Sequence, residues 1–218
     1  MIRLIIFDLD GTLVDAYPAI CTSVNHVLHT LGFNRRSSLE IKRAVGFGDR
    51  HLMVGFVGEQ LADRAMRLYR PHHARTLATL GRVKFLPGAK QLLVTLKRQG
   101  YTLAVASNRP TRFTTLILKT LGARKFFDVV LCGDRVPKPK PFPDMLLMIL
   151  KQLRASKREA LYVGDMTIDV RAGQRVGIKT VAVSTGSSSV AELKTLKPYR
   201  IISKIAELKT IIKAGVHT

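Results

Sequence analysis

Short apolar runs alternate with helical patterns along most of this sequence, and this alternation constrains the fold more than any other feature. The runs are rich in β-branched and aromatic residues, as is typical of strands that are buried on both faces of a sheet. They occupy residues 2–7, 102–106, 129–131, 160–163 and 180–183, with 200–202 as a weaker candidate. Between them, helical patterns occupy residues 88–99, 110–121, 143–154 and 167–176. We therefore expect an α/β fold, in which a Rossmann-like parallel sheet carries helices on both faces.

Residues 15–85 do not follow this alternation. Helical patterns cover residues 19–31 and 60–80, and no strand-like run of comparable quality separates them. Between them, Gly46 and Gly48 form a G-x-G loop that leads into a further helix start. We expect residues 15–85 to form an inserted, all-helical cap domain, with residues 1–14 and 86–218 forming the α/β core.

The chain is strongly basic, with 36 Lys and Arg against 15 Asp and Glu and a formal net charge of +21. Such a charge attracts nucleic acids, anionic membranes or small anionic substrates. The basic residues are spread along the chain, and aromatic residues make up only 6% with no Trp, which is poor material for stacking on bases. We expect a small phosphorylated anion as the partner, and neither specific nucleic-acid binding nor a membrane. The sequence does not indicate an oligomeric state.

The two cysteines, Cys21 and Cys132, lie far apart and have no metal-ligand spacing. The N-terminal apolar run ends at Asp8 and is too short for a signal peptide. We therefore expect a cytoplasmic protein.

Polar side chains follow the ends of several predicted strands. Because ligands bind beyond the carboxyl ends of the strands in such a sheet, and Asp8 and Asp10 point to the same side, we expect a site directly after the first strand. Other polar residues near strand ends are Thr12 after the first strand, Ser107 and Asn108 after the second, and Asp165 and Asp169 after the strand at 160–163, with Lys140 before helix 143–154.

In this order the motifs resemble those of the haloacid dehalogenase-like hydrolase superfamily. The superfamily pattern DxDx[TV] is matched at residues 8–12, a strand ends in Ser107, Lys140 begins a KPxPD run, and GDxxxD is matched at residues 164–169. The resemblance covers essentially the whole chain. The G-x-G loop and the following Leu52-Met53 further resemble phosphoglycolate phosphatase-like members, which carry a helical cap.

The resemblance implies a Mg²⁺-dependent phosphatase that hydrolyses a small, phosphoglycolate-like phosphomonoester through an aspartyl-phosphate. Asp8 would be the nucleophile, Asp10 the general acid and then the general base, and Lys140 would stabilise the transferred charge. The expected metal ligands are the side chains of Asp8 and Asp165 and the backbone carbonyl of Asp10. Asp169 would support the site by orienting Lys140 or the metal shell.

Further residues are expected to bind the phosphate or the rest of the substrate. They are Thr12, Ser107, Asn108, Lys140 and Arg109 in the core and Arg50 in the insert. Two of these have alternatives. Thr12 could be a structural hydrogen-bond partner of the motif loop or serve only the turn backbone, and Arg50 could lie in solvent. The neighbouring Lys138 offers a second register for the lysine motif, which we consider weaker. His72 and His73 are adjacent on a helix and point about 100° apart, so we expect them at the surface and not as joint metal ligands.

Other functions remain open at this point. A phosphosugar mutase or a pyrophosphatase of the same superfamily would use the same pair, Asp8 and Asp10. A dehalogenase is a weaker alternative, because the dehalogenases of this superfamily need neither the second acid, Asp10, nor a metal site. A basic nucleic-acid-binding protein is the alternative from a different class.

Overall fold

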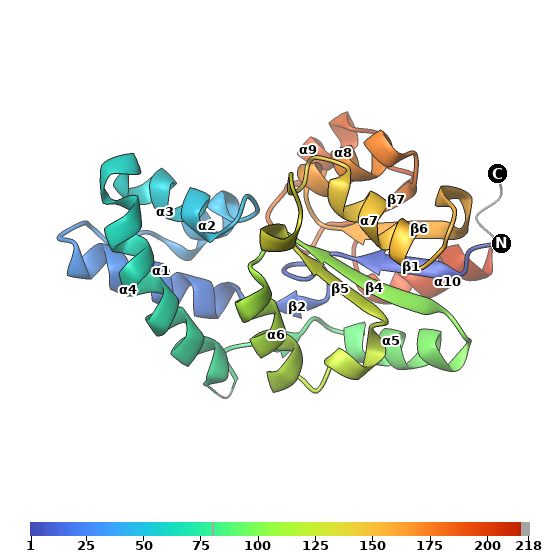
Figure 1. Ribbon diagram of the computed structural model, residues 1–218, viewed down its shortest axis with the longest axis horizontal. Helices are drawn as coiled ribbons and strands as arrows, with labels where there is room; N and C mark the ends of the chain where they lie inside the picture. The colour runs from blue at the N-terminus through green and yellow to red at the C-terminus, as the bar shows by residue number, and fades with distance from the viewer. Residues whose placement is uncertain (80, 215–218) are drawn as a thin grey trace.

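A six-stranded parallel sheet forms the centre of the computed structural model, which describes residues 1–79 and 81–214 (Figure 1). Its strands are β1 (Leu4–Phe7), β4 (Thr102–Ser107), β5 (Val129–Cys132), β6 (Ala160–Gly164), β7 (Lys179–Val183) and β8 (Arg200–Ile202). They lie in the order β5-β4-β1-β6-β7-β8, and every neighbouring pair is parallel. All six predicted runs are strands, the weaker one at 200–202 included, and the predicted α/β fold is confirmed. Two parts of the chain lie outside the described residues. They are residue 80, the last of the expected helix 60–80, and residues 215–218, the last of the expected core.

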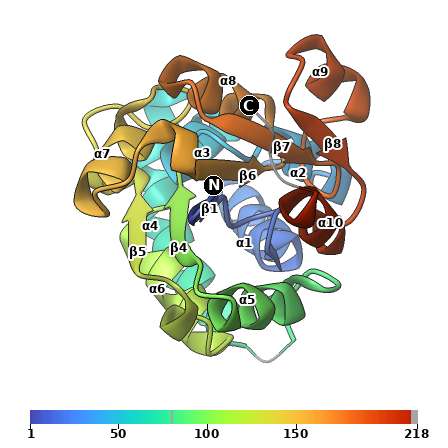
Figure 2. The same ribbon diagram turned by 90° about the vertical axis from the view of Figure 1, so that its right-hand side faces the viewer.

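Helices cover both faces of the sheet (Figure 2). One face carries α5 (Ala89–Arg98), α6 (Thr111–Thr120) and α10 (Leu208–Lys213), and the other carries α7 (Asp144–Gln152) and α8 (Thr167–Val176), with α9 (Val190–Thr195) beside α8. Along β1, Ile5 and Phe7 pack into the cluster that contains α5 and α6, whereas Leu4 and Ile6 pack with α7 and α8. This strand is buried on both sides, which explains its continuous apolar sequence.

Four helices form a separate unit at one end of the sheet (Figure 1). They are α1 (Tyr17–Thr30), α2 (Ser38–Ala44), α3 (Asp49–Val57) and α4 (Glu59–Ala78). The buried side of α1, which includes Ile20, Val24 and Val27, packs against α4, and α3 packs against α4 as well. Where the chain enters and leaves this unit, β2 (Val14–Asp15) and β3 (Lys84–Phe85) pair antiparallel.

The sequence missed the short elements. Strands of two residues, such as β2 and β3, cannot produce a recognisable periodicity. The start of helix α2 could have been predicted from the sequence, because Ser37 and Glu40 form a capping box there. Within the part of the chain that the structure describes, no helix combines the length and the apolar character needed to cross a bilayer.

Candidate active site

The site lies at the carboxyl end of β1, the strand between β4 and β6. Asp8 directly follows β1, and its backbone N–H donates to Val163 O (2.8 Å) on β6. The chain then turns at Gly11, whose φ of +83° favours glycine. A Cβ at Gly11 would also lie 2.8 Å from Asp165 Oδ2, so only glycine allows the motif loop to pass this close to the second carboxylate.

Lys140 connects two carboxylates from different strand ends. Its Nζ donates to Asp8 Oδ1 (2.6 Å) and to Asp169 Oδ1 (2.7 Å), and the side chain is almost fully buried. Burial by itself lowers the pKa of Lys140, but Asp169 and Asp8 outweigh it and hold this pKa above its ordinary value. Asp169 also accepts from the Tyr162 hydroxyl (2.6 Å) and from the Met166 N–H (2.9 Å). Asp169 is therefore held by three donors and orients the ammonium group of Lys140.

Asp8, Asp165 and Asp169 form a buried acidic group, with carboxylate oxygens within 4.8 Å of one another. Burial raises the pKa of Asp8 to about 7, with Lys140 opposing the rise and Asp169 adding to it. Burial, and then the charge of Asp8, raise the pKa of Asp165 well above its ordinary value. Anions crowded in this way are stabilised by a cation, and an all-oxygen donor set suits Mg²⁺. The residues present therefore fit the expected metal.

Thr12 and Ser187 hold Asp165 in place. The Thr12 hydroxyl donates to Asp165 Oδ1 (3.0 Å), and the Ser187 N–H donates to Oδ2 (3.0 Å). Thr12 is fully buried and does not line the cavity beside Asp8 and Lys140. The structure thus places Thr12 as a hydrogen-bond partner within the motif loops, because its hydroxyl fixes Asp165, and not toward the cavity where a phosphate was expected.

Asn108 joins three segments of the site. Its Nδ2 donates to Gly46 O (2.9 Å) and to Lys140 O (2.8 Å), and its Oδ1 accepts from the Lys140 N–H (2.9 Å). The side chain therefore fixes the Lys140 loop and links it to the G-x-G loop of the helical unit. Ser107, at the end of β4, is buried and lines the cavity beside Asp8 and Lys140.

Arg109 extends from the core toward α4. Its Nε donates to Asp10 Oδ2 (2.7 Å), and its Nη1 lies 2.8 Å from His73 Nε2. Because a guanidinium can only donate, His73 Nε2 must accept, which places the ring proton on Nδ1, 3.1 Å from Ser23 Oγ. Burial and the charge of Arg109 lower the pKa of His73 to about 2. The expectation that His73 lies at the surface is wrong, since its side chain is fully buried beneath this contact.

Arg50 is not in the site. Its guanidinium is half exposed and pairs with Glu59 (2.6 Å) and Asp63 (3.5 Å) on α4. The prediction that Arg50 binds substrate is therefore corrected in favour of its alternative, a solvent position. Its neighbour Asp49, which no sequence motif singled out, points inward instead, because adjacent helix positions differ by about 100°.

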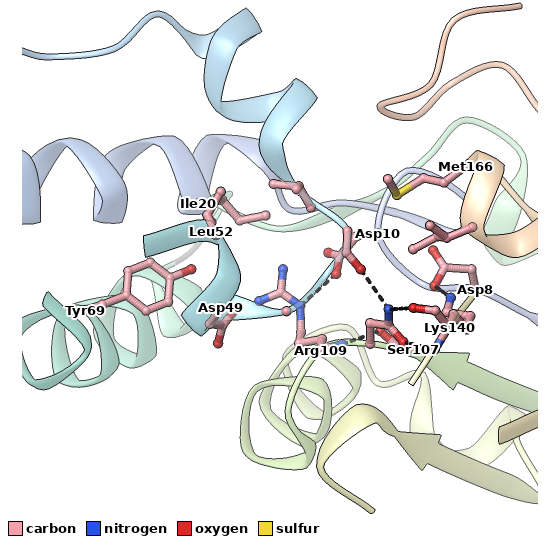
Figure 3. Close-up of a pocket in the computed structure, with 15 residues that line it drawn as sticks. Asp8, Asp10, Ile20, Asp49, Leu52, Tyr69, Ser107, Arg109, Lys140 and Met166 are labelled. Atoms are coloured by element: carbon pink, nitrogen blue, oxygen red, sulfur yellow. Dashed lines mark hydrogen bonds and ion pairs between the residues drawn. The ribbon is translucent and has the colours of Figure 1, made fainter. Parts of the chain in front are cut away.

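These residues enclose one cavity between the sheet edge and the helical unit (Figure 3). Asp8, Asp10 and Lys140 line its core side, and Asp49, Leu52 and Tyr69 line its helical side. Its volume of about 40 Å³ has room for about three water molecules.

Comparison with known proteins agrees with this geometry. The family model for "Haloacid dehalogenase-like hydrolase" matches residues 5–183. The chain is 29% identical to a phosphoglycolate phosphatase of Nitrosococcus oceani over 218 residues, with 96% of each chain covered. It is also 29% identical to phosphoglycolate phosphatase 1 of Pseudomonas aeruginosa, covering 94% of this chain and 78% of the relative.

A solved structure extends this similarity to the fold. The crystal structure of a predicted phosphoglycolate phosphatase from Haemophilus somnus matches with a TM-score of 0.91 and 27% identity, covering 97% of this chain and 98% of the other. The residues that match the family model include β4, β5, β6 and β7 and every motif of the site. The chain therefore belongs to the haloacid dehalogenase-like hydrolases and is similar to members of that family that are named phosphoglycolate phosphatases.

Proposed function

We propose that this protein is a Mg²⁺-dependent phosphatase that hydrolyses a small, phosphoglycolate-like phosphomonoester through an aspartyl-phosphate. The observation that carries the proposal is the contact of Lys140 with both Asp8 and Asp169 at the strand edge that also holds Asp165. The names of the relatives support a phosphate ester as substrate. In this proposal residues 15–85 are the cap, which closes over the site and excludes water.

Asp8 is the nucleophile. Lys140 Nζ donates to Asp8 Oδ1, whereas Asp8 Oδ2 accepts no hydrogen bond from the described residues. Oδ2 attacks phosphorus, and the bond from phosphorus to the ester oxygen breaks. The ester oxygen leaves with a proton from Asp10, and an aspartyl-phosphate remains on Asp8.

Asp10 is the general acid and base. Arg109 fixes its Oδ2, whereas its Oδ1 is buried and has no hydrogen-bond partner among the described residues. This second oxygen is available to the leaving group and then to water. In the second step it removes a proton from water as the water oxygen attacks phosphorus, which releases phosphate and restores Asp8.

Other residues hold the phosphoryl group and the cation. Lys140, the Ser107 hydroxyl and the backbone near Asn108 face the transferred oxygens and stabilise their charge. The side chains of Asp8 and Asp165 and the backbone carbonyl of Asp10 would hold Mg²⁺. When bound, the ion supplies positive charge that offsets the repulsion between these carboxylates and the phosphate.

The positive charge of the chain suits this role, because it raises the local concentration of small phosphorylated anions. Both cysteines are free and buried, and the proposed phosphatase is assigned to the reducing cytoplasm.

A phosphate-release assay tests the proposal. Wild type and Asp8→Asn are compared with and without Mg²⁺ on phosphoglycolate, sugar phosphates, nucleotides and pyrophosphate. We expect Mg²⁺-dependent release by the wild type and background release by Asp8→Asn. Equal release by the two proteins would contradict the mechanism. Isomerisation of a sugar phosphate without release would indicate a mutase, and release from pyrophosphate alone would indicate a pyrophosphatase.

A further inference from the structure

Two polar groups at the cap end of the cavity have no hydrogen-bond partner among the described residues. Asp49 Oδ2 and the Tyr69 hydroxyl are both buried and accept or donate no hydrogen bond within residues 1–79 and 81–214. Both residues line the cavity, and in Figure 3 they lie on the far side of Arg109 from Asp8 and Lys140. Asp49 starts α3 after Gly48, but its side chain does not cap that helix.

Leaving such groups unpaired costs free energy, and in folded proteins buried polar atoms nearly always have partners. Asp49 Oδ2 and the Tyr69 hydroxyl do not bond each other, although both face one cavity. The missing partner is therefore expected from a molecule bound between them. Ile20 and Leu52, which line the same end, offer an apolar contact for its carbon chain.

The charges at this end disfavour a carboxylate. Arg109 contacts Asp10 through Nε and His73 through Nη1, so two of its donor groups are used before a substrate binds. Asp49 is itself a carboxylate, with Arg109 and Arg70 as the cations that act on it. A substrate carboxylate against Asp49 Oδ2 would place two acceptors together with no proton between them. A hydroxyl group, in contrast, can donate to Asp49 and accept from Tyr69 at the same time.

We infer that the cap end of the cavity selects substrates with a hydroxyl group on the carbon chain of the phosphate ester, with Asp49 as its acceptor and Tyr69 as its donor. The inference rests on the proposed phosphatase function. If the protein is such a phosphatase, phosphate esters that carry a hydroxyl group are better substrates than phosphoglycolate, which ends in a carboxylate. Asp49 is then a specificity-determining residue that takes no part in the phosphoryl transfer.

A matched pair of esters tests this assignment. 2-Hydroxyethyl phosphate and 2-phosphoglycolate have the same two-carbon chain and differ at its end. We expect wild type to have the higher kcat/KM for the alcohol, and Asp49→Asn to lower the ratio of alcohol to carboxylate by about tenfold, as expected for loss of one charge-assisted hydrogen bond. Asp63→Asn, the same change at an exposed cap residue, should leave this ratio unchanged.

Any of three other results would contradict the assignment of Asp49 and Tyr69 to substrate selection. A wild type that prefers phosphoglycolate would remove the selection for a hydroxyl while leaving the phosphatase proposal intact. An equal loss on both esters in Asp49→Asn would mean that Asp49 serves the structure or the chemistry instead of specificity. No release from either ester or from any compound of the wider panel would contradict the phosphatase proposal itself, and the inference with it.

Discussion

Lys140 Nζ lies 2.6 Å from Asp8 Oδ1, although the two residues are 132 positions apart in the sequence. The parallel sheet produces this contact, because β1 and the strands beside it end at the same edge. The contact also shows which of two neighbouring lysines, Lys138 or Lys140, lies beside Asp8. Lys138 is exposed and its Nζ lies 5.2 Å from the centre of the Phe142 ring, outside the site.

Replacing Lys140 by Met should lower kcat by at least about 100-fold, because the transferred phosphoryl group loses a buried positive charge. Lys138→Met is the matched control and should keep kcat within about twofold of wild type. Steady-state phosphate release measures both, and circular dichroism checks that the variants fold. A larger loss in Lys138→Met than in Lys140→Met would show that the wrong lysine has been placed in the site.

Mg²⁺ should raise the melting temperature of the wild type. Binding at about 100 times the dissociation constant stabilises a protein by about 2.7 kcal/mol, which corresponds to about 5 to 10 °C for a chain of this size. Asp165→Asn should lose most of this shift, since Asp165 is one of the two side-chain ligands proposed. Asp63→Asn should keep it. Thermal unfolding in EDTA and in Mg²⁺ measures the shift, and a full shift in Asp165→Asn would exclude the proposed site.

The sequence predicted the core of the fold and of the site because both depend on local patterns. A strand buried on both faces is apolar throughout, and the residue after it lies at the sheet edge, so the local pattern placed Asp8 at this edge. The resemblance of the later motifs to a known family then placed Asp165 beside it. The pairing of Lys140 followed from the order of the motifs. Short elements such as α2, α9 and α10 lacked enough residues for a periodic pattern.

His73 should make the stability depend on pH. Its pKa is about 2 in the folded protein and about 6.5 when exposed, so the unfolded chain binds a proton that the folded one does not. This contribution to stability is present above pH 6.5 and is lost as the pH falls below it, by about 1.4 kcal/mol between pH 7.5 and 5.5. Other groups titrate in this range, so the wild type has to be compared with His73→Gln, which does not titrate.

We expect the free energy of unfolding of the wild type to fall relative to that of His73→Gln over this range. Denaturant unfolding at several pH values measures the difference. His29→Gln, at an exposed position, should follow the wild type. Parallel curves for wild type and His73→Gln would mean that His73 has the same pKa in the folded and the unfolded protein.

Asp49 should destabilise the folded protein at neutral pH. Burial raises its pKa from 3.8 to about 6, with Arg109 opposing the rise. The folded state therefore binds the proton more tightly, and stability falls as the pH rises from about 4 to above 6. Asp49→Asn removes this penalty and should be more stable than wild type by up to about 3 kcal/mol at pH 8, with no such gain at pH 4. Denaturant unfolding of the two proteins at both pH values tests this, and a less stable variant at pH 8 would contradict it.

The side of the site formed by the helical unit could not be predicted in the same way. The choice between Asp49 and Arg50 depends on the rotation of α3, which a G-x-G motif does not specify. The burial of His73 depends on Arg109, 36 residues away, which supplies the donor for its ring nitrogen. The inward direction of Asp49 and the burial of His73 both depend on packing between the helical unit and the sheet. Local sequence patterns do not predict such packing.

The pairing of β2 with β3 has a mechanical consequence. Both connections between the sheet and the helical unit pass through this one ribbon, in which Val14 lies opposite Phe85. The Gly11 N–H donates to Val14 O (2.8 Å), and Val14 also forms a bridge with Asp10. A rotation of the helical unit about this ribbon would therefore pull on the loop that carries Asp10. Such a rotation would shift, in the same movement, the carboxyl proposed to transfer the proton.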